Sequence, residues 1–369
     1  MKKEHNLLKK EISGWSNTNL SFSELATPKT IEEILSTIEK VKRSKKTILA
    51  RGSGQSYGDE ALNDKQVVID MKKINHIIDW NKSTGLLKVE VGATYEDVLT
   101  HCLKDNWTLA VIPGTRYVTM GGALANNVHG KNSYAQGNFG EWVQEFKIIL
   151  ASLEIYTCSK KQNSDIFFAA IGGAGLLGIV TEMTIQLIRV PSPYLSIKNS
   201  TASGLIELMN GLDNASKKDS YAIAQVDCFP ETHMLGRGTI HAGSFIPNIR
   251  NAKKVEEMKN ISGIMFAIFP KKLIPIIGKY LLCDFTMKWI SRLKYQLDRQ
   301  IGPKKPFVQD LFQFTFLLDQ VKDWKKAFRY GFYEYEPLIP KENARDVFKQ
   351  LIALGHEYGM PSYLSAIKI

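Results

Sequence analysis

The tract 113–132 combines the residue types that a cofactor site needs. It reads PGTRYVTMGGALANNVHGKN and holds the glycine pair Gly121 and Gly122, where backbone can approach a ligand closely. An imidazole, His129, and an ammonium group, Lys131, follow a few residues later. An imidazole exchanges a proton near neutral pH, and an ammonium group stabilises negative charge. We therefore predict a cofactor wall with acid–base chemistry beside it.

Two further glycine-rich stretches accompany this tract. Residues 51–59 read RGSGQSYGD, and residues 172–178 read GGAGLLG. The second stretch has the GxGxxG spacing of dinucleotide-binding folds, but it follows a predicted helix and precedes a predicted strand, which is the reverse of the order those folds require. Successive glycine N–H groups can still form a nest for an anion. One such loop would indicate a tight turn, whereas three favour a long ligand with phosphate groups.

Helices and strands that could position these loops alternate along the first half of the chain. Apolar residues at helical spacing predict a helix within 28–43, and Thr94 with Asp97 predicts a capping box for a helix that ends near Asn106. A short helix is also predicted at 164–170. Strands are predicted at residues 47–50, 66–71, 86–91, 143–150, 154–157 and 179–189. The pattern is α+β, without regular βαβ repetition.

Length and composition indicate a globular chain of two domains. Its 369 residues exceed the usual size of one hydrophobic core, and 44% of them are apolar. Pro191 and Pro193 follow the last predicted strand of the first half, so we predict domains at 1–190 and 191–369. The four cysteines are widely spaced without a CxxC pair, which argues against a disulfide framework or a zinc site, and we predict no bound metal.

The formal net charge of +11 favours an anionic partner, although solvated surface lysines explain it equally well. Nucleic acid is disfavoured because no basic run forms a recognisable binding module. Residues 265–294 mix apolar side chains with lysines, which suits either an interfacial membrane segment or a core helix with solvated lysines. Neither a signal peptide nor a membrane-spanning run is evident. We expect a cytoplasmic protein, peripheral at the inner membrane face if the segment is interfacial.

Together these motifs resemble the FAD-binding domain of the vanillyl-alcohol oxidase family. The resemblance rests on RGSGQSYG at 51–58, on PGTR and the glycine pair within 113–122, and on GGAGLLGIV at 172–180. Within that family, VHGKN at 128–132 and GNFG at 137–140 are similar to enzymes that oxidise a pentose carried on a polyprenyl phosphate. The resemblance implies a two-part FAD-binding domain and an α+β substrate domain on an antiparallel sheet. It also implies a partner reductase that completes an epimerisation.

The resemblance assigns cofactor contacts to named positions. Residues 51–59 would wrap the FAD diphosphate, and Gly114 with residues 119–122 would line the cofactor. Residues 126–129 would reach the isoalloxazine, and Val180 would touch the cofactor through its backbone. These residues are Arg51, Gly52, Ser53, Gly54, Gln55, Ser56, Tyr57, Gly58, Asp59, Gly114, Thr119, Met120, Gly121, Gly122, Asn126, Asn127, Val128, His129 and Val180. Many family members bind FAD covalently through a histidine where this chain has Gln55, so we predict non-covalent FAD.

The implied reaction transfers hydride from an alcohol carbon to the flavin while the hydroxyl proton leaves. His129 would accept that proton, and Lys131 would contact the substrate phosphate or orient the sugar. A polyprenyl-phosphate-linked pentose is the substrate that the resemblance implies, with a role in cell-envelope polysaccharide synthesis. The alternatives are a soluble alditol or sugar lactone as substrate, and a non-catalytic FAD-binding fragment.

The chain departs from the family pattern in its second half. Residues 313–319 and 333–340 align with the substrate-facing strands of the family, but Thr315 replaces a tyrosine, and Glu334 and Glu336 replace glutamines. These carboxylates would bind sugar hydroxyls, pair with lysines, or lie exposed on a strand edge, so the sugar need not be the family's pentose. The sequence also stops within a predicted strand, before a lysine and a tyrosine that the family uses, and we expect a truncated substrate domain.

Overall fold

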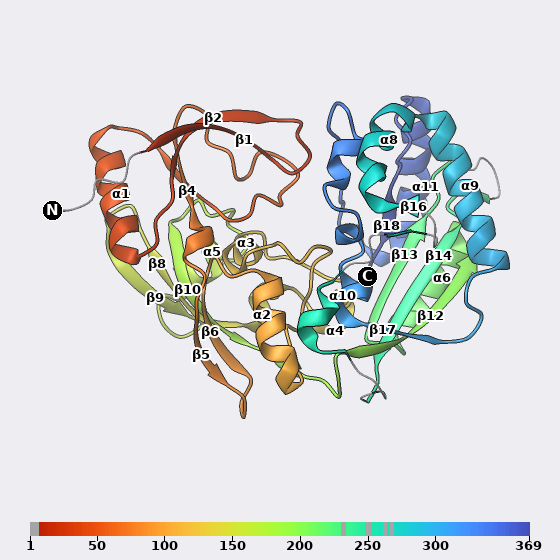
Figure 1. The fold of residues 1–369 in the computed structure, drawn as a ribbon, viewed down its shortest axis with the longest axis horizontal. Coiled ribbons are helices and arrows are strands. Elements are labelled where there is room, and N and C mark those ends of the chain that lie inside the picture. Colours follow the sequence, from red (N-terminus) through yellow and green to blue (C-terminus); the bar gives the residue numbers. More distant parts are fainter. Residues whose placement is uncertain (1–6, 230–233, 248, 250–252, 261–263, 266–268) are drawn as a thin grey trace.

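Two halves of the chain, which meet between Arg189 and Tyr194, stand side by side in the computed structural model (Figure 1). The structure describes residues 7–229, 234–247, 249, 253–260, 264–265 and 269–369. Within this described part of the chain, no helix is both long enough and apolar enough to cross a membrane.

The first half contains a mixed sheet and an antiparallel sheet. The mixed sheet has the order β1-β2-β4-β3, with β2 and β3 parallel to β4. The second sheet has the order β5-β6-β10-β8-β9 and is antiparallel throughout. The strands are β1 (Leu8–Ser13), β2 (Leu20–Ala26), β3 (Ile48–Arg51), β4 (Val67–Asp70), β5 (Ile77–Asn81), β6 (Leu86–Glu90), β8 (Val143–Ile149), β9 (Ile155–Ser159) and β10 (Ile179–Gln186), with β7 (Trp107–Thr108) paired to β11 (Ile188–Arg189).

Five helices connect these strands. They are α1 (Ile31–Arg43), α2 (Tyr95–Cys102), α3 (Met120–Ala125), α4 (Ser133–Gln136) and α5 (Ser164–Ala170). Thr30 caps α1 by accepting a hydrogen bond from the Glu33 N–H at 3.3 Å. The predicted capping box of α2 is present, since the Thr94 and Asp97 side chains bond each other's backbone N–H groups.

The second half is built on an antiparallel sheet, as predicted. Its order is β17-β12-β14-β13-β18. The strands are β12 (Tyr194–Ala202), β13 (Tyr221–Val226), β14 (Gly238–Phe245), β17 (Phe307–Asp310) and β18 (Ser365–Ile367), and the short strands β15 (Ile264–Met265) and β16 (Phe269–Pro270) pair separately. The helices are α6 (Leu205–Ser216), α7 (Val255–Met258), α8 (Ile274–Leu281), α9 (Asp284–Gln300), α10 (Leu311–Thr315) and α11 (Lys341–Glu357).

Short 3₁₀ turns complete the described elements. They are Met71–Lys73, Leu103–Asp105, Phe139–Trp142, Lys271–Leu273, Leu318–Gln320 and Trp324–Ala327. The predicted strand 179–189 is interrupted at Leu187, whose N–H donates to the Gly85 carbonyl at 2.9 Å. The GxGxxG stretch at 173–178 lies between α5 and β10, so its order is helix, loop, strand, and the Rossmann interpretation is excluded.

One large apolar core joins the two halves. It contains Ile34 from α1 and Leu99 from α2 together with Leu195 from β12 and Phe312 from α10. A smaller cluster lies between α6 and the far side of the second sheet. The sheets change between Arg189 and Tyr194, while the division of the chain into domains 1–190 and 191–369 stays a prediction.

Candidate functional site

A cavity of about 660 Å³ is lined by residues of both halves. The first half contributes the segment 50–58, residues of α3 and the loop 173–178, and the second half contributes residues 332–334, Glu336 and Lys368. This volume lies within the range of pockets that hold large organic ligands. Figure 1 places the C-terminus in the second half, towards the side that faces the first half, which agrees with the position of Lys368 in the cavity wall.

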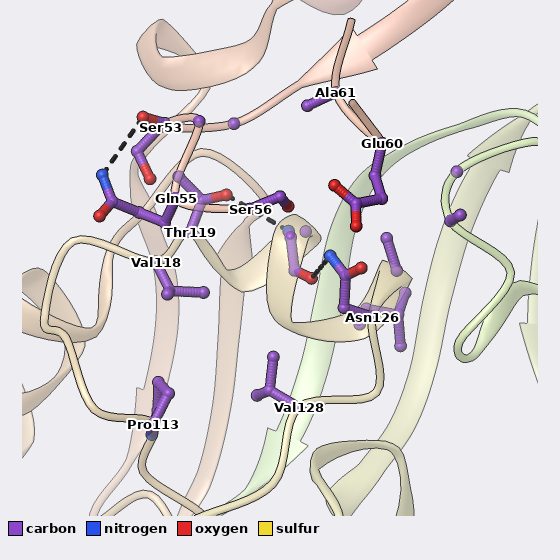
Figure 2. Close-up of a pocket in the computed structure, with 18 of the residues that line it drawn as sticks. Ser53, Gln55, Ser56, Glu60, Ala61, Pro113, Val118, Thr119, Asn126 and Val128 are labelled. Carbon is purple, nitrogen blue, oxygen red and sulfur yellow. Dashed lines mark hydrogen bonds between the residues drawn. The ribbon is translucent and has the colours of Figure 1, made fainter. Parts of the chain in front are cut away.

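Glycine is required where the first loop meets α3. A Cβ atom on Gly52 would lie 2.2 Å from the Thr119 Oγ1 atom, and one on Gly121 would lie 2.9 Å from the Val91 Cβ atom. Thr119 caps α3, because its Oγ1 atom accepts a hydrogen bond from the Gly122 N–H at 3.3 Å. Figure 2 shows the side chains of Ser53, Gln55 and Ser56 near Thr119. The close approach at Gly52 brings the backbone of the loop against the start of α3.

Side chains tie the first loop to its surroundings. The Arg51 guanidinium donates to the Ala61 carbonyl at 2.9 Å and to the Ser13 carbonyl at 2.7 Å. The Ser53 hydroxyl donates to the Tyr117 carbonyl, which joins the loop to the segment before α3. Arg51 therefore anchors the loop to two backbone carbonyl groups and also lines the cavity.

The glycine-lined walls fit FAD. Gly54 and Gly175 have φ angles of +68° and +73°, a region that favours glycine. A Cβ atom on Gly175 would have no neighbour within 4 Å, so backbone there faces open space. Amide side chains at Gln55 and Asn126 add donors and acceptors to the same cavity, and the Asn126 amide donates to the Gly122 carbonyl at 3.1 Å (Figure 2). Open backbone and amide groups suit a phosphate-bearing cofactor with a polar ring.

His129, Glu336 and Lys368 form a charged group in the cavity wall. The His129 Nε2 atom lies 3.2 Å from the Glu336 Oε2 atom, and the Lys368 Nζ atom lies 3.0 Å from Oε1 of the same carboxylate. The hydrogen bond from His129 lowers the pKa of Glu336 to about 2, with the Lys368 charge assisting and burial opposing. Burial, reinforced by the Glu336 charge, raises the pKa of Glu334. The Glu336 carboxylate therefore binds a proton less tightly than the Glu334 carboxylate does.

Lys131 lies apart from that group and does not line the cavity. Its side chain is buried, and its Nζ atom donates to the Phe314 carbonyl at 2.5 Å and to the Thr315 carbonyl at 3.0 Å. It also lies 4.7 Å from the centre of the Phe314 ring. Burial, with a smaller contribution from the Lys368 charge, lowers the pKa of Lys131 to about 7. The structure places this side chain at the end of α10 rather than in the cavity wall.

Thr315 also lies away from the cavity, and the predicted strand around it is wrong. The segment is the helix α10, because the Asp310 carboxylate accepts a hydrogen bond from the Gln313 N–H at 2.9 Å and caps a helix immediately after β17. The Thr315 hydroxyl donates to the Leu311 carbonyl at 2.6 Å and is buried. The segment that holds Glu334 and Glu336 has no regular secondary structure.

Three predicted cofactor residues do not line the cavity. Met120 is buried in the core, the Asn127 Oδ1 atom accepts a hydrogen bond from the Gly140 N–H at 2.9 Å, and Asp59 is exposed. The structure brings the other predicted residues together in the cavity wall. They are Arg51, Gly52, Ser53, Gly54, Gln55, Ser56, Tyr57, Gly58, Gly114, Thr119, Gly121, Gly122, Asn126, Val128, His129, Val180, Glu334 and Glu336.

Sequence reasoning missed several lining residues from the second half. Trp324 and Phe332 line the cavity, with their rings 5.2 Å apart, and the Phe332 ring lies 5.4 Å from that of Tyr57. Lys368 was also missed. It directly follows the strand β18, whose last residue, Ile367, is buried, and it lines the cavity. No local pattern distinguishes these aromatic residues, because they reach the cavity only through the packing of the two halves.

Comparison with known sequences supports a flavin site. The family described as FAD binding domain matches residues 23–159. The chain is 29% identical to decaprenylphosphoryl-beta-D-ribose oxidase of Mycolicibacterium smegmatis over 98% of its length and 78% of that protein. It is 26% identical to L-gulonolactone oxidase of Mus musculus, over 57% of the chain and 47% of the mouse protein.

Solved structures show the same fold. 6-Hydroxy-D-nicotine oxidase from Arthrobacter nicotinovorans superposes with a TM-score of 0.55 at 17% identity, covering 66% of this chain and 57% of that one. A carbohydrate oxidase from Microdochium nivale superposes with a TM-score of 0.51 at 18% identity, covering 60% of this chain and 48% of that one. The matched region thus spans about half the length of these solved relatives.

Proposed function

We propose that this chain, an FAD-dependent oxidoreductase, oxidises a secondary alcohol of a sugar carried on a polyprenyl phosphate. A pentose is the sugar we favour, because the relative matched over 98% of the chain is named for a decaprenylphosphoryl ribose. The product would be the corresponding keto sugar, and a partner reductase would then complete an epimerisation in cell-envelope polysaccharide synthesis.

One observation carries this proposal. A single cavity contains the glycine-lined walls that fit FAD and the charged group of His129, Glu336 and Lys368. Oxidation of an alcohol needs a hydride acceptor and a proton acceptor close together. The cavity provides a place for FAD as the hydride acceptor and the His129 imidazole as the proton acceptor.

Bound FAD would supply the hydride acceptor. In our proposal the Glu336 carboxylate accepts a hydrogen bond from the His129 Nε2–H, which orients the imidazole and leaves Nδ1 as the atom that accepts the hydroxyl proton. The same carboxylate holds the Lys368 ammonium group in the cavity, where its charge offsets negative charge that develops in the reaction. Glu334, whose pKa is raised, would hydrogen-bond a sugar hydroxyl.

Lys131 has a different role in this proposal. Its ammonium group is engaged by two carbonyl oxygens of α10 and is buried. We therefore assign it to positioning α10 beside the tract that contains His129, and we assign no substrate contact to it.

The proposal is tested by anaerobic mixing of the FAD-loaded protein with farnesylphosphoryl ribose, free ribose and L-gulono-1,4-lactone. We expect the oxidised-flavin absorbance to disappear with the lipid-linked sugar at a concentration at least about tenfold lower than with either soluble compound, a difference of about 1.4 kcal/mol in transition-state stabilisation. Bleaching by the lactone alone would replace the proposal with a lactone oxidase, a function that the L-gulonolactone oxidase relative favours. Bound flavin that no compound bleaches would indicate a non-catalytic FAD-binding protein.

A further inference from the structure

Large apolar side chains project outward at every fourth residue through the end of α8 and along α9. They are Leu281, Phe285, Trp289, Leu293, Leu297 and Ile301, with exposed fractions between 36% and 75%. The five residues from Phe285 to Ile301 follow one another at four-residue spacing along α9 and its C-cap, so they form a stripe along that helix, and Leu281 ends the separate helix α8. Ile290 on α9 and Ile276 and Tyr280 on α8 are also exposed and extend it. We call these nine residues the α8–α9 face.

The opposite side of α9 is part of the folded structure. Met287 and Tyr295 are buried, and α9 packs against β12 and β14. The Arg237 guanidinium lies 4.7 Å from the centre of the Tyr295 ring, which fixes this buried side further. Figure 1 shows α9 on the outer side of the second sheet. The helix therefore already has a core-facing side, and the α8–α9 face is additional apolar surface.

Cationic side chains accompany the exposed apolar residues. Lys288 and Arg292 are exposed on α9, and the Arg292 guanidinium lies 5.7 Å from the centre of the Trp289 ring. The Lys279 ammonium group lies 6.0 Å from the centre of the Tyr280 ring on α8. The acidic residues of α9 are engaged elsewhere, since Asp284 accepts a hydrogen bond from the Tyr363 hydroxyl and Asp298 pairs with Lys294. The face thus joins apolar area to positive charge.

We infer that the α8–α9 face docks onto the surface of a bilayer that contains anionic phospholipid. Apolar side chains on one helix face would enter the boundary between headgroups and acyl chains, and the adjacent cations would contact lipid phosphates. The net charge of +11 acts in the same direction. This inference deepens the proposed function, because a polyprenyl phosphate presents its sugar at a bilayer surface, but docking is measurable without any sugar. Residues 266–268 of the predicted segment 265–294 lie outside the described residues.

The test is co-sedimentation of the full chain with vesicles, without substrate. We expect binding to phosphatidylcholine vesicles that contain roughly one third phosphatidylglycerol, and at least about tenfold weaker binding to pure phosphatidylcholine. The double variant Phe285→Ser with Trp289→Ser should lose at least about tenfold in affinity, and so should Lys288→Glu with Arg292→Glu. Tyr358→Ser, which removes an aromatic side chain that is 65% exposed after α11, is the matched control and should bind as the wild type does.

Three results would overturn the inference. One is absence of wild-type binding to the anionic vesicles, and another is equal binding by the wild type and both double variants. The third is a dimer in sedimentation velocity that the Phe285→Ser, Trp289→Ser variant converts to monomer, since a second copy would then cover the face. Thermal unfolding of each variant identifies loss of folding, and the charge-reversal variant retains the apolar residues as an independent test. Failure of sugar oxidation with intact vesicle binding would affect the proposed function alone.

Discussion

The His129 Nε2 atom lies 3.2 Å from the Glu336 Oε2 atom, so an imidazole of the glycine-rich tract meets a carboxylate of the second half. The pairing joins a segment of the FAD-binding region to an irregular segment that follows Tyr333. Neither residue type is unusual in isolation. Their contact in the cavity, with Lys368 on the other carboxylate oxygen, makes Glu336 a positioning residue in the proposed reaction.

Replacing Glu336 by glutamine should slow oxidation more than it weakens substrate binding. The amide keeps the size of the side chain but removes the charge that holds His129 and Lys368. We expect kcat to fall about tenfold, or about 1.4 kcal/mol, with KM changed less than about twofold. The measurement is steady-state kinetics over a range of pH, with Glu342→Gln at the start of α11 as a matched control. An unchanged kcat and an unchanged pH profile would remove Glu336 from the mechanism.

The same carboxylate predicts a pH dependence of folding stability. Its pKa is about 2 in the folded protein against an ordinary value of 4.5. A carboxyl group with a lowered folded pKa stabilises the folded state above its unfolded pKa, and this contribution is lost as the pH falls through the folded value. Because the side chain is 48% exposed, we expect a contribution of no more than about 1 kcal/mol.

Urea unfolding of the wild type and of Glu336→Gln at several pH values measures that contribution. The difference in free energy of unfolding should be constant above about pH 4.5 and should vanish towards pH 2. A difference that persists at pH 2 would mean that the substitution acts through packing rather than through charge.

Local sequence signals predicted much of the first half, because short-range chemistry determines those elements. Thr94 and Asp97 are three residues apart, and their capping box needs only local backbone. The helix–loop–strand order around 173–178 was predicted from the same kind of signal. The family resemblance predicts a strand around Thr315, whereas the cap at Asp310 begins a helix there. Lys131 could not be placed from sequence, since its partners at 314 and 315 are about half the chain away.

Replacing Lys131 by methionine should reduce stability rather than catalysis. The substitution leaves the Phe314 and Thr315 carbonyl groups without their buried donor, at a cost of about 1–3 kcal/mol at neutral pH. The folded pKa of about 7 lies below the ordinary 10.5, so the unfolded chain binds more protons and wild-type stability should rise between pH 7 and pH 10.5. Lys131→Met should remove this rise.

Chemical unfolding at pH 7 and pH 10, together with the rate of flavin reduction, tests this role. We expect the rate in folded Lys131→Met to stay within about threefold of the wild type, which corresponds to about 0.65 kcal/mol. A loss of about a hundredfold in rate with unchanged stability would instead restore the prediction that Lys131 contacts the substrate.

Adding a methyl group at Gly52 should disturb the cofactor wall. The new Cβ atom would lie 2.2 Å from the Thr119 Oγ1 atom, which caps α3, so either the loop or the cap must move. We expect Gly52→Ala to weaken FAD binding at least about tenfold, or about 1.4 kcal/mol. Quenching of FAD fluorescence on titration measures the affinity, and Gly355→Ala in α11 is a matched control. FAD affinity equal to that of the wild type would show that this wall does not contact the cofactor.

Gln55 predicts that FAD is bound without a covalent link at this position. Its side chain lines the cavity, and its amide lies 3.4 Å from the Ser53 carbonyl, but an amide nitrogen is not a nucleophile that forms a flavin bond. Acid precipitation of the FAD-loaded protein should therefore release the flavin into the supernatant. Flavin that remains with the denatured pellet would contradict the prediction and would require another attachment residue. His129 would be the first candidate, because its imidazole also lines the cavity, and the substitution His129→Ala would then release the flavin.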